Sequence, residues 1–170
     1  MSTDKKFMSL SKISYGYDLN PKWAAEKWLS EPTTLEFISL WESLHNLDFK
    51  KDIYIDLCSN ALSHGASPNV EELQTKCKIK GMFVDKNFKE DIYLHKDIAM
   101  DFSSWVSPSF RTFCLLLMND GGFDTKFNFN SEEDFVIGSK TLAEITKKQA
   151  LENYQKSAGD FVYNCNLLSC

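Results

Sequence analysis

Apolar residues recur at helical spacing between residues 95 and 118, and this segment carries the clearest pattern in the chain. A helix that begins at His95 or Asp97 and buries one face is predicted here. Ser107 stops this helix and caps the next one, in which Pro108 takes the first position. The two apolar faces consist of Ile98, Ala99, Phe102, Trp105 and Val106, and of Phe110, Phe113, Cys114 and Leu117. The pattern therefore predicts a helix–turn–helix corner.

Lysine alternates with apolar residues just before this corner, over residues 76–84. A strand in this segment places three lysines on one face and apolar side chains on the other. These lysines are Lys76, Lys78 and Lys80. Residues 85–87, Asp-Lys-Asn, have turn chemistry, and residues 92–94 are apolar enough for a return strand. A β-hairpin that shares a core with the corner is predicted, with Gly81 as a candidate bulge.

Start and stop signals predict two helices nearer the N-terminus. Asn20 caps a helix that begins at Pro21, and Pro32 ends it, because proline lacks the N–H donor that a helix interior needs. Thr33 or Thr34 then caps the second helix. Its apolar stripe comprises Leu35, Phe37, Ile38, Trp41 and Leu44.

Residues 48–70 carry weaker signals. Apolar and polar residues alternate over residues 48–58, which fits either a strand or the start of a helix. The composition of residues 63–69 is typical of a loop, and a short helix opens at Pro68 or Asn69.

A strong break at residues 119–122, Asn-Asp-Gly-Gly, divides the chain. Beyond it, residues 123–129 alternate as in a strand and residues 139–157 are typical of a helix. We therefore expect a domain over residues 1–118 and a C-terminal extension over residues 119–170, whose role the sequence does not define.

Composition is typical of a folded protein, with 43% hydrophobic and 14% aromatic residues among 170. The formal net charge is −5, and Arg111 is the only arginine. Nucleic-acid-binding proteins usually show a basic face and use arginine for bidentate contacts to guanine. Composition alone therefore does not favour DNA binding.

The cysteine pattern indicates a reducing compartment. Five cysteines, an odd number without regular spacing, are typical of free thiols rather than of a disulfide framework. No run of about 20 apolar residues occurs, so no membrane-spanning helix and no membrane partner are expected. We predict a cytoplasmic location.

Two blocks of the sequence resemble the signatures of the KilA-N domain family. The C-terminal block contains the Trp-x-Ser-Pro-x-Phe motif, although Lys96 stands where the family has proline. Its matching residues are His95, Ile98, Ala99, Phe102, Trp105, Val106, Ser107, Pro108 and Phe110. The N-terminal block is matched by Trp28, Leu29, Thr34, Glu36, Phe37 and Ile38. The resemblance covers roughly residues 10–118.

This resemblance implies an α+β fold similar to that of the fungal APSES domains. It also implies a DNA-binding regulatory protein of phage, prophage or large-virus type, placed in the host cytoplasm if phage-encoded. The chain departs from the family between the Trp-Leu and Thr positions, where basic residues are common and this sequence has Ser30, Glu31 and Pro32. Residues 1–118 hold 16 acidic and 14 basic residues.

The lysine-rich hairpin is the best candidate for nucleic-acid contact. Its lysines can neutralise backbone phosphates, and such contacts carry little sequence information. The candidate residues are Lys76, Lys78, Lys80, Lys86 and Lys89. A solvated strand face without a ligand is an equally good interpretation of the same run.

A second hypothesis keeps the fold but changes the partner. The missing basic residues and the overall acidity fit a protein-binding module, such as a viral inhibitor of a host defence protein. The partner is then a host protein instead of DNA. A third interpretation is a homodimer, whose combined electrostatic field differs from that of one chain.

The sequence contains no recognisable catalytic or metal-binding motif. Phosphate-binding glycine loops, nucleophile elbows and HExxH are absent, so we predict a non-enzymatic protein without cofactor. Cys58, His64 and Cys77 lack the spacing of a closed zinc site, so no metal is expected. His95 is expected to cap or brace the start of its helix, and the tryptophans to pack in the core.

Overall fold

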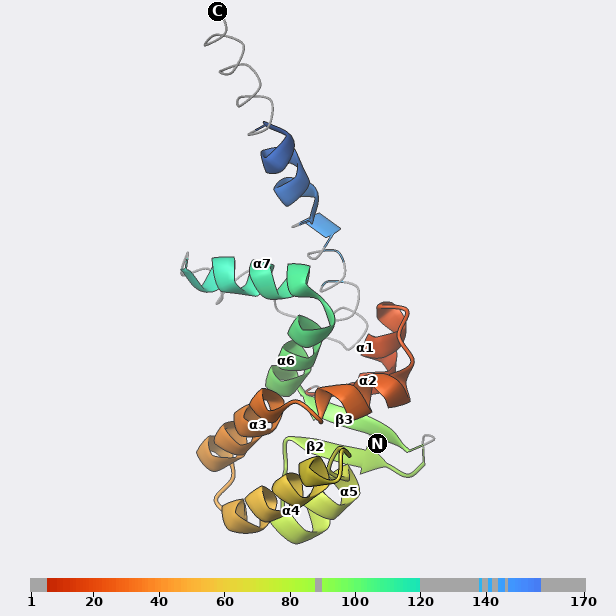
Figure 1. The fold of residues 1–170 in the computed structure, drawn as a ribbon, viewed down its shortest axis with the longest axis vertical. Coiled ribbons are helices and arrows are strands. Elements are labelled where there is room, and N and C mark those ends of the chain that lie inside the picture. The colour runs from red at the N-terminus through yellow and green to blue at the C-terminus, as the bar shows by residue number, and fades with distance from the viewer. Residues whose placement is uncertain are drawn as a thin grey trace, which may run out of the picture.

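The computed structural model describes residues 6–87, 90–119, 138, 141, 144–145 and 147–156. In these residues helices pack against a three-stranded antiparallel sheet, which confirms the predicted α+β class (Figure 1). The strands are β1 (Phe7–Ser9), β2 (Met82–Asp85) and β3 (Asp91–His95). The helices are α1 (Leu10–Gly16), α2 (Pro21–Trp28), α3 (Pro32–His45), α4 (Lys51–Ser63), α5 (Val70–Glu72), the π-helix η1 (Leu73–Cys77), α6 (Lys96–Val106) and α7 (Pro108–Asn119).

The sheet has the strand order β1-β3-β2, with β3 in the centre. Met8, Leu94 and Met82 are aligned across the three strands, and all three are buried in the core. The return strand predicted over residues 92–94 and the hairpin turn before it are confirmed. β1 adds a third strand that the sequence analysis did not predict.

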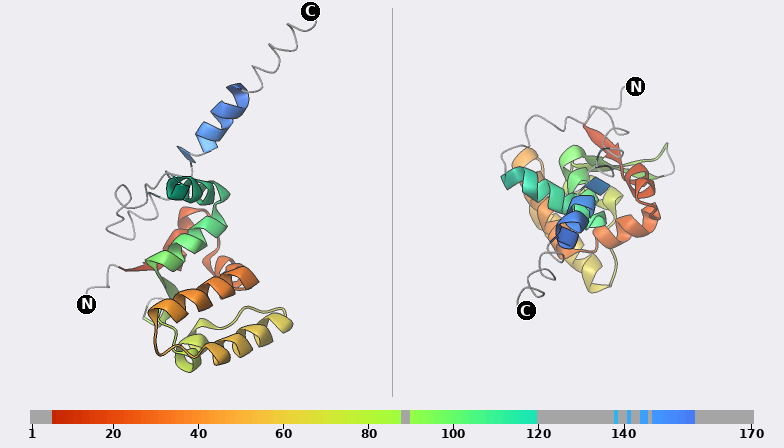
Figure 2. Two further views of the ribbon diagram at one scale, coloured as in Figure 1. Left: turned by 90° about the vertical axis from the view of Figure 1, so that its left-hand side faces the viewer. Right: turned by 90° about the horizontal axis from the view of Figure 1, so that it is seen from above.

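The helix–turn–helix corner is confirmed at α6 and α7. The hydroxyl oxygen of Ser107 accepts a hydrogen bond from the backbone N–H of Phe110 at 3.2 Å, as expected of an N-cap. Figure 2 shows α7 running across the end of α6. Phe102 of α6 is fully buried, and its ring lies 5.2 Å from that of Trp28 and 6.1 Å from that of Trp105. The two family-like blocks therefore share one hydrophobic core.

α2 begins as its sequence predicts. The side-chain oxygen of Asn20 accepts a hydrogen bond from the N–H of Trp23 at 3.0 Å. Trp28 is fully buried, and its indole N–H donates to the Asp101 carboxylate of α6 at 3.0 Å. Burial raises the pKa of Asp101, and the indole N–H partly offsets that shift.

α3 differs from its prediction at its first residue and in which side chains it buries. Pro32 opens this helix at its first turn, so a cap at Thr33 or Thr34 is wrong. Proline fits there because the first helical N–H has no intrahelical acceptor. Leu44 was assigned to the buried stripe but is 80% exposed, whereas Glu42 is fully buried.

The ambiguous segment 48–58 becomes helical from Lys51 onward, in α4. Tyr54 and Cys58, one turn apart, are its buried residues, which is the helical spacing and not the alternation of a strand. The short helix predicted at Asn69 is confirmed, with Asn69 as its cap.

The strand predicted over residues 76–84 is wrong before Met82. Leu73 and Cys77 are buried one turn apart, so this part of the lysine run continues a helix as η1. Lys78 then takes a left-handed conformation with φ 59°, which no strand tolerates. Gly81 lies at a bend, where an added Cβ would approach Ile98 Cδ1 to 2.5 Å.

Several predictions fall on the C-terminal part of the chain. The strand over residues 123–129 lies outside the described residues, whereas the described residues 147–156 are helical, as predicted for 139–157. Among the described residues, no helix is long and apolar enough to cross a membrane.

Candidate nucleic-acid interface

A buried carboxylate positions the backbone of the lysine run. Glu42 of α3 is fully buried, and its Oε1 accepts hydrogen bonds from the N–H groups of Lys80 at 2.9 Å and Gly81 at 2.6 Å. Its Oε2 accepts from the side-chain amide of Asn46 at 2.7 Å. Three N–H donors thus satisfy a carboxylate that has no cationic partner in the part of the chain that the structure describes.

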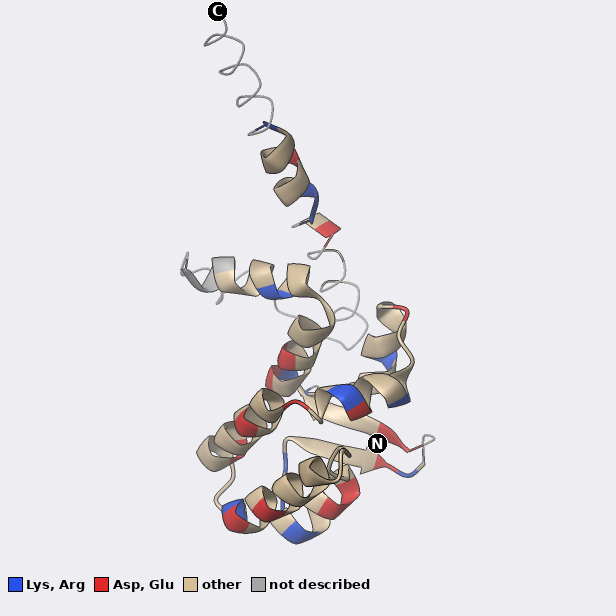
Figure 3. Ribbon diagram, in the orientation of Figure 1, with Lys and Arg blue, Asp and Glu red and all other residues tan. Residues whose placement is uncertain are grey.

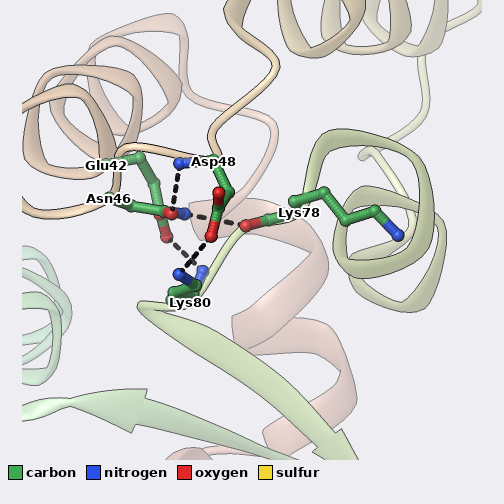
Figure 4. Close-up of polar contacts among 5 residues, drawn as sticks. All are labelled: Glu42, Asn46, Asp48, Lys78 and Lys80. Atoms are coloured by element: carbon green, nitrogen blue, oxygen red, sulfur yellow. Dashed lines mark hydrogen bonds and ion pairs between the residues drawn. The ribbon is translucent and has the colours of Figure 1, made fainter.

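Asn46 extends this arrangement to Lys78 (Figure 4). Its amide N–H also donates to the Lys78 carbonyl at 2.7 Å, while its Oδ1 accepts from the N–H of Asp48 at 3.1 Å. The N–H of Lys50 donates to the Cys77 carbonyl at 2.9 Å. Glu42 of α3, and Asn46 and Lys50 of the α3–α4 connection, therefore hold the backbone of Cys77, Lys78, Lys80 and Gly81. We call Glu42 and Asn46 the polar bracket.

The predicted lysines lie at exposed positions but do not share one strand face. Lys76 is in η1, Lys78 and Lys80 are in the loop before β2, and Lys86 is in the hairpin turn. Lys89 lies outside the described residues.

Three of these lysines pair with carboxylates. The N–O distances are 2.6 Å for Lys76–Glu72, 2.8 Å for Lys80–Asp48 and 2.5 Å for Lys86–Glu71. The Lys80 ammonium lowers the pKa of Asp48, and Glu71 raises the pKa of Lys86. Figure 3 shows acidic and basic residues interspersed along the ribbon of the described residues. Exposed ion pairs of this kind are weak, so a phosphate can displace the carboxylate.

Lys78 differs from Lys76, Lys80 and Lys86 in its surroundings. Its side chain is exposed and points away from the polar bracket (Figure 4), and it has no acidic partner among the described residues. Together with Lys50 and Lys80 it lines a solvent-open hollow of about 480 Å³. The complete lining is Asp48, Lys50, Gln74, Lys78, Ile79 and Lys80, and we call it the lysine hollow.

Lys50 was missed by the sequence analysis. It belongs to the α3–α4 connection, far along the chain from the lysine run, and joins the hollow through its hydrogen bond to Cys77. The adjacent pair Lys50-Lys51 was visible in the sequence, but nothing local indicated which of the two faces the loop at Lys78.

His95 acts as the predicted cap of α6. Its Nδ1 accepts from the N–H of Asp97 at 3.4 Å, and its ring lies 4.8 Å from that of Trp41 and 5.6 Å from that of Phe7. Burial lowers the pKa of His95, and the Asp97 carboxylate partly opposes that shift. This geometry gives His95 a structural task at the start of the helix.

The cysteines considered as metal ligands are packing residues. Cys58 and Cys77 are buried free thiols, and burial raises the pKa of Cys58 to about 11, which keeps it protonated at neutral pH. His64 is exposed at the end of α4, where its Nδ1 contacts the Asn60 carbonyl. Within the described residues, no group of three His, Cys, Asp or Glu side chains has metal-binding geometry.

Comparison with protein families finds that the sequence model of the KilA-N domain matches residues 1–120. Comparisons with curated proteins and with solved structures return no match. The matched range contains every element from β1 to α7, including the polar bracket and the lysine hollow.

Proposed function

Because the chain belongs to the KilA-N domain family, whose domains are generally non-catalytic and DNA-binding, we propose that it is a DNA-binding regulatory protein of phage or prophage type. The proposed phosphate contacts are Lys76, Lys78, Lys80, Lys86 and Lys89. Lysine contacts phosphate as a point charge, so the binding is directed at the DNA backbone and discriminates weakly between sequences.

The observation that carries this proposal is the fixed backbone beneath the lysines. The polar bracket holds Lys80 and Gly81 through Glu42, and Lys78 through Asn46. Exposed cations on a preorganised backbone lose less conformational entropy on binding than cations on a mobile loop.

Carboxylates near the lysines are expected to limit the affinity for DNA. Glu72, Asp48 and Glu71 compete with phosphate for three of the lysine ammonium groups. We therefore expect measurable binding at low salt that weakens steeply as salt increases, because neutralised phosphates release condensed counterions.

A charge-reversal variant tests the proposal. Replacing Lys76, Lys78 and Lys80 with glutamate is expected to lower the affinity for generic duplex DNA and to flatten its salt dependence, measured by fluorescence anisotropy. A matched triple variant, Lys22→Glu, Lys27→Glu and Lys148→Glu, makes the same charge change at other exposed lysines. Equal affinity of the first variant and the parent, or equal loss in both variants, contradicts these contacts.

A second candidate function is favoured by the apolar surface of α3 and α4, which lie side by side (Figures 1 and 2). Exposed apolar side chains on the two helices and on the connection between them are Leu40, Leu44, Leu47, Ile53 and Ile55. Leu40 and Ile55 also line a groove of about 350 Å³ between the two helices. Where exposed apolar side chains are contiguous, as Leu40 and Ile55 are at this groove, they favour an interaction surface.

The chemistry of the partner follows from the rim of this surface. Glu36 and Lys51 line the groove, and Asp52 and Asp56 of α4 are exposed next in sequence to Ile53 and Ile55. The proposed occupant is therefore a host protein that presents apolar side chains flanked by basic ones, as fits an inhibitor of a host defence protein.

Retention of lysate proteins by the parent and by a Leu40→Glu, Leu44→Glu variant separates the two candidates. After nuclease treatment, a protein held by the parent and lost by the variant supports the protein-binding function. A protein held equally by both, or no retained protein, contradicts it.

A further inference from the structure

The lysine hollow concentrates positive charge in an acidic protein. Three lysines line it, Lys50, Lys78 and Lys80, against one carboxylate, that of Asp48. Asp48 is bound to the Lys80 ammonium at 2.8 Å. Lys50 and Lys78 form no ion pair among the described residues, although Lys50 is near enough to Asp48 to help lower the pKa of that carboxylate. The lining therefore keeps an excess of two positive charges.

The walls of the hollow are held in place from both sides. The backbone N–H of Lys50 donates to the Cys77 carbonyl, and the amide of Asn46 donates to the Lys78 carbonyl. These bonds join the α3–α4 connection to the loop before β2. The three lysines therefore lie on two chain segments whose backbones are held together by hydrogen bonds.

Lys78 adopts a backbone conformation that lysine rarely takes. Its φ of 59° is left-handed, which disfavours a side chain with a Cβ and suits glycine. A strained residue of this kind persists only when its surroundings hold it, and such residues concentrate at functional sites. Here the left-handed backbone ends η1 as its C-terminal cap, and the Lys78 side chain extends away from Glu42, Asn46 and Asp48 (Figure 4).

Gln74 adds a neutral donor. Its side-chain oxygen accepts a hydrogen bond from the N–H of Val84 at 3.0 Å, which fixes the orientation of the amide. The amide NH₂ is then available to the hollow that Gln74 lines. Cations and a neutral donor around an open concave surface suit a tetrahedral oxyanion.

We propose that the lysine hollow is a binding site for a single phosphate group, with Lys50, Lys78 and Lys80 as its cationic walls. This inference deepens the proposed function and rests on it, because the phosphate is taken to be one of the DNA backbone. The volume of about 480 Å³ leaves space for the attached sugar as well. A phosphorylated small molecule carries the same phosphate group. The experiment therefore has two arms, one with duplex DNA and one with inorganic phosphate.

The first arm compares Lys50→Ala with Lys51→Ala in the full chain. Lys51 is the exposed neighbour of Lys50 but lines the groove between α3 and α4 instead of the hollow. Lys50→Ala is expected to weaken binding of generic duplex DNA about tenfold, the size of one charge-assisted contact, and Lys51→Ala less than twofold. Lys78→Gly, which suits the left-handed backbone and removes one charge, is expected to act like Lys50→Ala.

The second arm titrates ¹⁵N-labelled protein with inorganic phosphate at constant ionic strength. We expect the amide signals of residues 78–81 to shift in the parent, and to need a higher phosphate concentration for the same shift in Lys50→Ala. If these amides shift but duplex DNA does not bind, the phosphate site is supported and its ligand is a small phosphorylated molecule. The proposed DNA-binding function is then wrong. If duplex DNA binds parent and Lys50→Ala equally and phosphate shifts no amide, DNA binding stands and the phosphate site is wrong.

Discussion

The α6–α7 corner and residues 76–81 both carry a regular hydrophobic pattern, yet only the pattern of the corner predicted its structure. In the corner, the buried positions are apolar and the caps are local, with Ser107 bound to Phe110 only three residues away. In residues 76–81, the buried positions belong to a π-helix and a loop, and Glu42 of a distant helix binds the backbone.

The difference between the two regions shows what a hydrophobic pattern along the sequence can report and what it cannot. Periodicity reports which side chains face an apolar core, and it is reliable when the core alone decides the conformation. It does not report a buried carboxylate that satisfies backbone donors elsewhere in the chain. The lysine run alternates because Cys77, at the end of η1, and Ile79, in the following loop, are both buried between exposed lysines.

The core of the corner is expected to give the largest effect. Phe102→Ala removes a fully buried ring that packs between Trp28 and Trp105, and we expect it to lower the free energy of unfolding by about 3–5 kcal/mol. Urea denaturation measures this loss. Leu44→Ala on α3 is the control, since an 80% exposed side chain should change stability by less than about 0.5 kcal/mol. Similar losses in both variants would remove the contrast between core and surface.

The polar bracket is expected to give the next largest effect. Glu42→Gln places an amide NH₂ among the N–H donors of Lys80, Gly81 and Asn46, so at least one buried donor loses its acceptor. We expect a loss of about 2–3 kcal/mol in urea denaturation, together with faster hydrogen exchange of the Lys80 and Gly81 amides. The exposed Glu36→Gln on the same helix should change neither quantity. Unchanged exchange in Glu42→Gln would mean that the bracket does not hold the loop.

Gly81 provides a second test of how residues 76–81 are held in place. A Cβ at this position meets Ile98 Cδ1 at 2.5 Å and Trp41 Cζ3 at 2.7 Å, so Gly81→Ala is expected to lower the free energy of unfolding by about 1–3 kcal/mol. Ile98→Val removes the nearer atom. Gly81→Ala should therefore cost less in the Ile98→Val background, as a double-mutant cycle of urea denaturation can measure. If the two substitutions change the free energy of unfolding additively, the contact with Ile98 is not the cause of the loss in Gly81→Ala.

The smallest expected effect is a pH dependence at the start of α6. Burial lowers the pKa of His95, so the unfolded chain binds a proton more readily than the folded one. Stability contributed by neutral His95 is therefore present above the ordinary histidine pKa of about 6.5 and is lost as the pH falls below it. Thermal melts of the parent should drop between pH 7 and pH 5. His95→Asn keeps a capping side chain and removes the titration, so its melts should drop less.

Much of the fold follows from local signals in the sequence. The caps at Asn20, Asn69 and Ser107 and the return strand of the hairpin are set by residues within a few positions of each other. β1 was not predictable in this way, because a three-residue strand is defined by its partner β3 and not by its own pattern.

The candidate site was predictable only in part. The exposure of Lys76, Lys78, Lys80 and Lys86 was expected from their chemistry, and it is observed. Their carboxylate partners and the contribution of Lys50 depend on the distance between chain segments that only the folded structure brings together.

The central functional claim is that the loop held by the polar bracket is the DNA-contacting surface, and amide chemical shifts during titration with generic duplex DNA test it most directly. At low salt, we predict that the shifted signals concentrate at Lys50 and residues 76–81. Shifts confined to the apolar surface of α3 and α4, or the absence of any shift, would contradict the claim.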